Sequence, residues 1–243
     1  MIEELTKELN IKFNDISLLE RALTHRSYLN ENRDIDKNNE RLEFLGDAVL
    51  ELIISKHLYE NYPNHPEGDL TSFRSAIVRT ESLAEASREL GYGKYLRLAK
   101  GEEETGGRDK DYILANTFEA VLGAIFIDQG LEPCKDLVYR ILVPKIDNIV
   151  KNRLDIDSKT KIQEMAQAKF KLTPTYEVVE ENGPDHDKEF MVAVKIGDKI
   201  IGRGKGGSKQ KAEESAATEG LKYIEKAWIK RFHLLKSHRY AKD

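Results

Sequence analysis

The sequence predicts two domains of different class, an all-α domain over residues 1–150 and a small α+β domain over residues 158–227. Two observations support this division. Apolar residues in the first part recur at helical spacing, and no strand pattern of comparable strength occurs there. After residue 158 the pattern changes to one helix, three strand-like segments and an Ala-rich helix. A length of 243 residues suits one large domain or two modest ones, so it permits this division.

Seven segments of the first domain have helical periodicity. The breaks between them fall at Pro63 and Pro66, at Gly91 and Gly93, and in the polar run 101–110. We expect that run to be a mobile loop without a catalytic role, because a phosphate-binding loop carries Lys after its glycines and this run carries glutamates. The expected helices span residues 2–9, 17–29, 38–60, 67–76, 80–90, 111–128 and 131–150.

Three carboxylates recur at helical spacing within residues 39–47. Glu40, Glu43 and Asp47 are three and four residues apart, so they share one face of a helix. Because the residues between them are apolar, we expect this helix to be largely buried, where an unpaired carboxylate costs several kcal/mol. An ordinary solvated face is the alternative. The favoured interpretation is a divalent metal such as Mg²⁺, which takes carboxylate oxygens as ligands.

A second apolar helix, expected over residues 112–128, carries Asn116 and Glu119 on one face. Two polar groups on a core helix require a partner. We therefore expect four side chains, Glu43, Asp47, Asn116 and Glu119, to converge from two packed helices on one metal site.

The second domain is expected to follow a charged linker over residues 151–157 and to have the order α-β-β-β-α. Thr173-Pro174 ends its first helix, and Gly197-Asp198 forms the turn of a hairpin. The expected elements are a helix over 159–170, strands over 175–181, 189–196 and 199–202, and a helix over 209–226.

Basic side chains gather where the last helix of this domain begins. Lys205, Lys209 and Lys211, with Ser208 between them, lie where unpaired backbone N–H groups and the helix dipole favour phosphate. A soluble helix cap is the alternative for the lysines alone. Their coincidence with the α-β-β-β-α order favours phosphate binding.

The acidic segments resemble a known family. Asn39–Leu50 (NERLEFLGDAVL) is similar to the signature of ribonuclease III, and Ala115–Ala120 (ANTFEA) resembles that family's second acidic motif. Arg21–Tyr28 (RALTHRSY) resembles its early helix, and the resemblance extends to about Ala227. It implies an endonuclease that uses Mg²⁺, with Mn²⁺ as a substitute and no organic cofactor. Its products would be 5′-phosphate and 3′-hydroxyl ends with short 3′ overhangs, in the processing of ribosomal and messenger RNA.

The resemblance also implies roles for single residues. Glu43, Asp47 and Glu119 would hold the metal, with Asp47 and Glu119 the most important for catalysis. The family pairs two such domains as a homodimer, in which Phe44 would insert into the partner. Glu40 and Glu67 would lie near the valley, the groove that the two paired domains share. Ordinary core packing is the alternative for Phe44.

The last seventy residues before Ala227 resemble a double-stranded RNA-binding domain. In such domains the first helix and the loop between the first two strands contact successive minor grooves. The matching positions here are Thr160, Gln163, Glu164, Gln167, Pro184 and His186. A solvated side chain is an equally good interpretation of His186.

One position departs from the family pattern, because Asn116 stands where Asp is usual. Its carbonyl can contact a metal but brings no charge. The departure sustains an alternative, a non-catalytic protein that binds double-stranded RNA or the ribosome. A hydrolase of small phosphorylated substrates is a third hypothesis, but it leaves the RNA-binding domain without a use. We favour the nuclease because three acids remain.

Charge and cysteine content limit the remaining interpretations. Residues 1–157 carry 21 Lys and Arg against 30 Asp and Glu, so binding of a polyanion needs metal ions, local basic patches or the second domain. The single Cys134 argues against a disulfide framework. We expect a cytoplasmic protein, from the family resemblance together with the absence of a targeting or membrane-spanning pattern. The basic tail, residues 228–243, is expected either to extend RNA contact, to form a helix extension or to be disordered.

Overall fold

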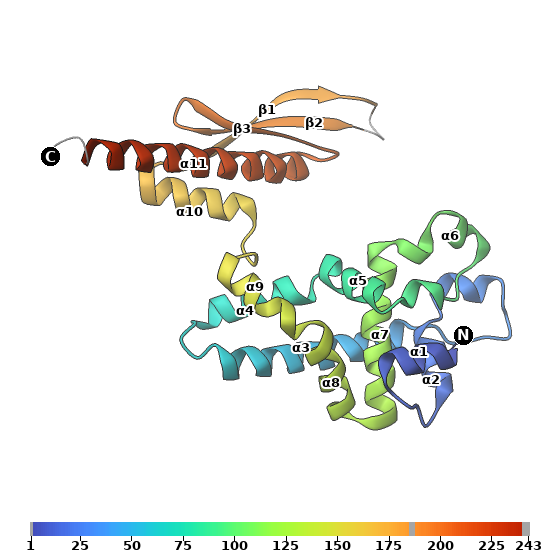
Figure 1. Ribbon diagram of the computed structural model, residues 1–243. Coiled ribbons are helices and arrows are strands. Elements are labelled where there is room, and N and C mark those ends of the chain that lie inside the picture. Colours follow the sequence, from blue (N-terminus) through green and yellow to red (C-terminus); the bar gives the residue numbers. More distant parts are fainter. Residues whose placement is uncertain (1, 185–187, 240–243) are drawn as a thin grey trace. The chain divides into compact units, whose positions relative to one another are not determined.

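The computed structural model describes residues 2–184 and 188–239, with side chains described to residue 224 (Figure 1). The chain divides into two compact units, Met1–Asp155 and Ile156–Asp243. The secondary-structure elements described in the first unit are all helices, and the second unit contains a three-stranded sheet. None of the helices, as far as they are described, is long and apolar enough to cross a membrane.

The first unit is built around one central helix, α7 (Asp111–Gln129), whose side chains are buried on almost every face. The long helix α3 (Glu40–Asn61) crosses it, as Figure 1 shows. The surrounding helices are α1 (Ile2–Leu9), α2 (Ile16–Ala22), α4 (Glu67–Val78), α5 (Thr80–Glu89), α6 (Lys100–Glu104), α8 (Leu131–Ile141) and α9 (Val143–Asn152). Three short 3₁₀ turns, η1 (Arg26–Asn30), η2 (Tyr92–Lys94) and η3 (Gly107–Asp109), complete the unit.

Two glycines allow α3 and α7 to cross almost backbone to backbone. A Cβ atom added at Gly46 would lie 1.7 Å from the carbonyl oxygen of Glu119, and one at Gly123 would lie 2.2 Å from that of Leu42. No side chain fits in either place, because real Cβ atoms do not approach so closely. The crossing therefore depends on glycine at both positions.

The structure differs from the expected helices in two places. The segment 17–29 is broken after Ala22, where Thr24 forms a bridge with Arg97 and the ring of His25 accepts a hydrogen bond from the backbone N–H of Ser27. The segment 131–150 is two helices, because a new helix begins at Val143 with Pro144 in its first turn.

The polar run 101–110, expected to be a loop, contains α6 and η3. Two ion pairs hold these turns: Arg108 Nε lies 2.6 Å from Glu103 Oε1, and Lys110 Nζ lies 2.6 Å from Glu102 Oε1. The charged side chains that suggested a solvated loop thus pair with one another across the turns.

The second unit has the predicted order of α10 (Ser158–Phe170), β1 (Thr175–Asn182), β2 (Glu189–Ile196), β3 (Lys199–Gly206) and α11 (Lys209–Arg239). The strands form one antiparallel sheet in the order β1-β2-β3. Its core consists of Val192, Val194 and Ile201 from the sheet, packed with Ile162 and Ala216 of the helices. Strand β3 is four residues longer than expected, and α11 continues through part of the basic tail.

Glycines again set how closely the helix approaches the sheet. A Cβ at Gly202, Gly204 or Gly206 would come within 2.5, 2.1 or 2.6 Å of the backbone of α11. From Gly202 to Gly206 every second residue therefore faces α11, and Arg203 and Lys205 between them face the other side of the sheet. A register shift before Gly202 lets Ile201 face the helices as well.

Candidate functional site

The crossing of α3 and α7 brings together the four polar side chains that the sequence singled out. Glu43 and Asp47 flank Gly46 on α3, while Asn116 and Glu119 lie on the part of α7 that meets it. The carbonyl oxygen of Glu119 itself lies against Gly46. The predicted convergence from two packed helices is therefore present in the fold.

The carboxyl of Glu119 is the most perturbed acid of this group. Burial raises its pKa to about 8, and the nearby charges of Asp47, Glu43 and Glu51 act in the same direction. Burial also raises the pKa of Glu43, helped by Glu40 and Asp47, whereas the Asn116 side chain acts as a hydrogen-bond donor and opposes the rise. The group therefore concentrates negative potential at one place on the first unit.

The acids are less buried than the sequence predicted. Glu43 and Glu119 are only half-buried, and Asp47 is exposed. As placed, no three His, Cys, Asp or Glu residues of the described chain form a group that could hold a metal ion. The donor chemistry nevertheless fits Mg²⁺, since the carboxyls are oxygen ligands whose mutual repulsion a cation relieves.

Glu40 borders this group, since its charge raises the pKa of Glu43, and Glu67 lies on another helix, α4. Glu40 is exposed, and its Oε1 atom lies 3.8 Å from a guanidinium nitrogen of Arg26. Glu67 is exposed at the start of α4, where its carboxylate accepts a hydrogen bond of 3.0 Å from the hydroxyl of Thr71.

Phe44 does not pack in the core of its own chain. Its side chain is 80% exposed, and Leu52 and Tyr59 on the same helix are 57% and 75% exposed. The expectation of a helix buried around most of its circumference is therefore wrong for this face of α3. Core packing within the chain is excluded as the explanation of Phe44.

The second unit presents the predicted nucleic-acid residues on several surfaces. Thr160 and Gln163 of α10 line one groove with Ser208 and Lys211 at the start of α11. Glu164 and Gln167 line a neighbouring hollow, and Lys209 is exposed. Pro184 is exposed in the loop after β1, and His186 lies outside the described residues.

Lys205 departs from the expected lysine cluster. It lies between Gly204 and Gly206, which face α11, so its side chain points to the opposite side of the sheet. There its Nζ atom lies 2.9 Å from Glu189 Oε2. The period of two along a strand separates Lys205 from Lys209 and Lys211, although the three are close in sequence.

Sequence reasoning missed the two glycines that build the site. Gly46 directly precedes Asp47, and Gly123 follows Glu119 by four residues. A glycine inside a helix costs about 1 kcal/mol relative to alanine, so its presence in two otherwise apolar helices was a usable signal of close packing.

Comparisons with known proteins agree with this geometry. A family model described as Ribonuclease-III-like matches residues 15–146, and the double-stranded RNA binding motif matches residues 158–224. The chain belongs to the ribonuclease III family. It is 48% identical to Ribonuclease 3 of Streptococcus gordonii over 88% of this chain and 92% of that protein. Against Ribonuclease 3 of Dehalococcoides mccartyi it is 43% identical over 93% of this chain and 96% of the relative.

A solved ribonuclease III nuclease domain has the same helical fold. The domain from Campylobacter jejuni is 38% identical in sequence, with a TM-score of 0.56, and covers 59% of this chain and 97% of that domain. That protein is described as having a region involved in dimer formation. The ribonuclease III fold thus accounts for the first unit, and the RNA binding motif accounts for the second.

Proposed function

We propose that the protein is an endoribonuclease that hydrolyses phosphodiesters of double-stranded RNA with the help of Mg²⁺. The observation that carries the proposal is the acidic group at the α3–α7 crossing, in a chain whose second unit is a double-stranded RNA binding motif. The first unit supplies concentrated negative charge for a cation, and the second supplies contacts to an RNA backbone.

Glu43, Asp47 and Glu119 would hold the ion, and Mn²⁺ would substitute because it accepts the same oxygen ligands. The bound ion would supply positive charge that stabilises the reacting phosphate and activates water. Asp47, the exposed acid, and Glu119, whose charge is the hardest to bury without a cation, would matter most for the catalytic step. Asn116 adds no charge, but its side chain lies near Glu43 and lowers the pKa of that carboxyl.

Binding of the duplex is assigned to the second unit. We expect the first helix to enter one minor groove through Thr160, Gln163, Glu164 and Gln167. The next minor groove would be contacted by Pro184 and His186. The helix start that carries Ser208, Lys209 and Lys211 would bind phosphates between the grooves. Lys205, on the other side of the sheet, would contribute little.

The protein would act as a homodimer through the exposed apolar face of α3. Phe44 would insert into the partner, and Glu40 and Glu67 would border the shared valley. An isologous dimer presents two related sites, one to each strand of a duplex. Paired cuts would leave 5′-phosphate and 3′-hydroxyl ends with short 3′ overhangs. Phe44→Asp is expected to shift the protein from dimer to monomer in analytical ultracentrifugation, and an unchanged mass would contradict this assignment.

The family suggests precursor ribosomal RNA and structured messages in the cytoplasm as the setting. The direct test is cleavage of a long labelled RNA duplex with Mg²⁺, with a chelator control. We expect metal-dependent cutting by the parent that Glu119→Ala abolishes. Cutting by Asn116→Asp alone would identify the parent as a disabled enzyme. If no version cuts although all bind duplex RNA, the protein is a non-catalytic binding protein.

A further inference from the structure

The connection between the two units begins at the end of α9, where the chain turns back on the first unit. Arg153 ends the helix in the left-handed conformation, with φ of 49°. The next backbone N–H, that of Leu154, donates a hydrogen bond of 3.0 Å to the carbonyl oxygen of Ile149. This hydrogen bond ends α9 at Arg153, and the residues that follow run toward α4.

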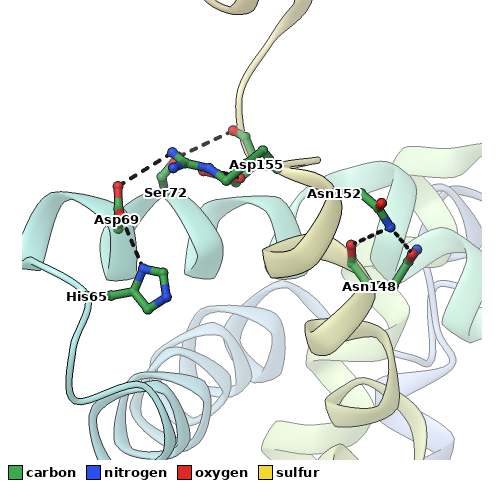
Figure 2. Close-up of polar contacts among 7 residues, drawn as sticks. His65, Asp69, Ser72, Asn148, Asn152 and Asp155 are labelled. Carbon is green, nitrogen blue, oxygen red and sulfur yellow. Dashed lines mark hydrogen bonds and ion pairs between the residues drawn. The ribbon is translucent and has the colours of Figure 1, made fainter. Parts of the chain in front are cut away.

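One face of α4 receives these residues (Figure 2). Asp69 and Ser72 are three residues apart and so lie on the same side of the helix. A guanidinium nitrogen of Arg153 lies 3.5 Å from Asp69 Oδ1, and the hydroxyl of Ser72 donates a hydrogen bond of 3.3 Å to the backbone oxygen of Asp155. Arg153 Nε also lies 3.3 Å from Asp155 Oδ1.

Two further contacts hold Asp69 and Arg153 in place on α4. The imidazole Nδ1 of His65 lies 3.1 Å from the second oxygen of Asp69, so that carboxylate is held from both sides. The guanidinium carbon of Arg153 lies 5.8 Å from the centre of the Phe73 ring, which is fully buried. Residues 153–155 are therefore docked on α4 by polar and ring contacts, all within the first unit.

The beginning of the second unit is equally well defined. The carboxylate of Asp157 accepts a hydrogen bond of 2.8 Å from the backbone N–H of Thr160 and so caps α10. Between the docked Asp155 and this cap stands Ile156 alone. The linker expected over seven residues, 151–157, is thus reduced to Ile156 and the backbone of Asp157.

We propose that Asp69, Ser72, Arg153 and Asp155 form a latch that shortens the tether between the two units to two residues. Two residues span about 7 Å at most, whereas the five residues from 153 to 157 span about 17 Å once the latch opens. The latch would therefore decide how far the RNA-binding unit can move from the catalytic unit. Arg153 is 44% exposed and Asp69 28%, so the ion pair is open to solvent and can separate. This inference does not depend on the nuclease activity.

The test measures the width of the distance distribution between spin labels on the two units of the full-length chain. Labels are placed at Glu104→Cys and Asp198→Cys, both exposed, and the buried Cys134 remains unlabelled. The labelled protein is diluted with unlabelled chain, so that each measured pair lies within one molecule. A reference with three glycines inserted after Ile156 has a five-residue tether while its latch is closed, which is the length of the parent's tether once the latch opens.

We expect the parent to give a narrow distribution and the double variant Ser72→Ala/Arg153→Gly to broaden it to the width of the glycine reference. Glycine at 153 keeps the left-handed turn, so the end of α9 is preserved. The substitution removes the ion pairs of Arg153 and its contact with the Phe73 ring. The matched control Arg79→Ala removes an exposed ion pair with Glu81 at the end of α4 and leaves the width unchanged. A double variant as narrow as the parent, or a parent as broad as the reference, would overturn the proposal.

Discussion

The carboxyl of Glu119 makes the stability of the metal-free protein depend on pH in a specific way. Burial and neighbouring acids raise its pKa to about 8 in the folded chain, from an ordinary value of 4.5. The folded state therefore holds this proton more tightly than the unfolded state. The resulting stabilisation is complete below pH 4.5 and is lost as the pH rises through 8. Glu119→Gln, which cannot ionise, should remove this loss.

The size of the effect follows from the two pKa values. Each tenfold difference in proton affinity corresponds to about 1.4 kcal/mol, so the full difference would be at most about 5 kcal/mol. Because Glu119 is only half-buried, solvent screening reduces the expected contribution to about 2 kcal/mol. Between pH 5 and pH 9, Glu119→Gln should therefore lose about 2 kcal/mol less stability than the parent.

Urea unfolding followed by circular dichroism, with a chelator present, would measure this difference. Glu67→Gln, an exposed acid on α4, is the matched control and should follow the parent. Millimolar Mg²⁺ should restore stability to the parent at high pH but not to Glu119→Gln, because a cation that binds only the folded state stabilises it. If parent and Glu119→Gln show the same pH dependence, the charge repulsion assigned to the helix crossing is wrong.

Three further predictions concern packing and RNA binding. Gly46→Ala should lower the free energy of unfolding by about 3 kcal/mol, because its Cβ would meet the backbone of α7. The control Gly68→Ala has open space around it and should change that free energy by less than about 1 kcal/mol, as measured by thermal unfolding. Tyr92→Phe should leave the free energy of unfolding unchanged or raise it by about 1 kcal/mol, since the buried hydroxyl has no hydrogen-bond partner among the described residues. A decrease of more than about 1 kcal/mol in urea unfolding would show that the hydroxyl does have a partner. Lys211→Ala should reduce the slope of log affinity for duplex RNA against log salt concentration by about 0.9, and Lys205→Ala should leave that slope unchanged. Equal slopes in the two variants would refute the assignment of phosphate binding to Lys211 and not to Lys205.

The acidic group was predictable because each half of it is a local pattern. Glu43 and Asp47 share a helix face by their spacing, as do Asn116 and Glu119, and apolar neighbours indicate that both helices pack. Their burial was overestimated, because hydropathy along a helix does not distinguish a side covered by the same chain from one left open. Phe44 illustrates this limit, since a residue 80% exposed has the same sequence pattern as a core residue.

The sequence by itself determined the type of nearly every element, the order of the two units and the residue types of the site, because periodicity and turn chemistry act over a few residues. Tertiary structure alone decided which elements meet and how closely. Gly46 and Gly123 become essential only where two helices touch, and Lys205 separates from its neighbours only once β3 packs on α11. The docking of residues 153–155 on Asp69 and Ser72 likewise joins positions more than eighty residues apart, a relation that no local pattern contains.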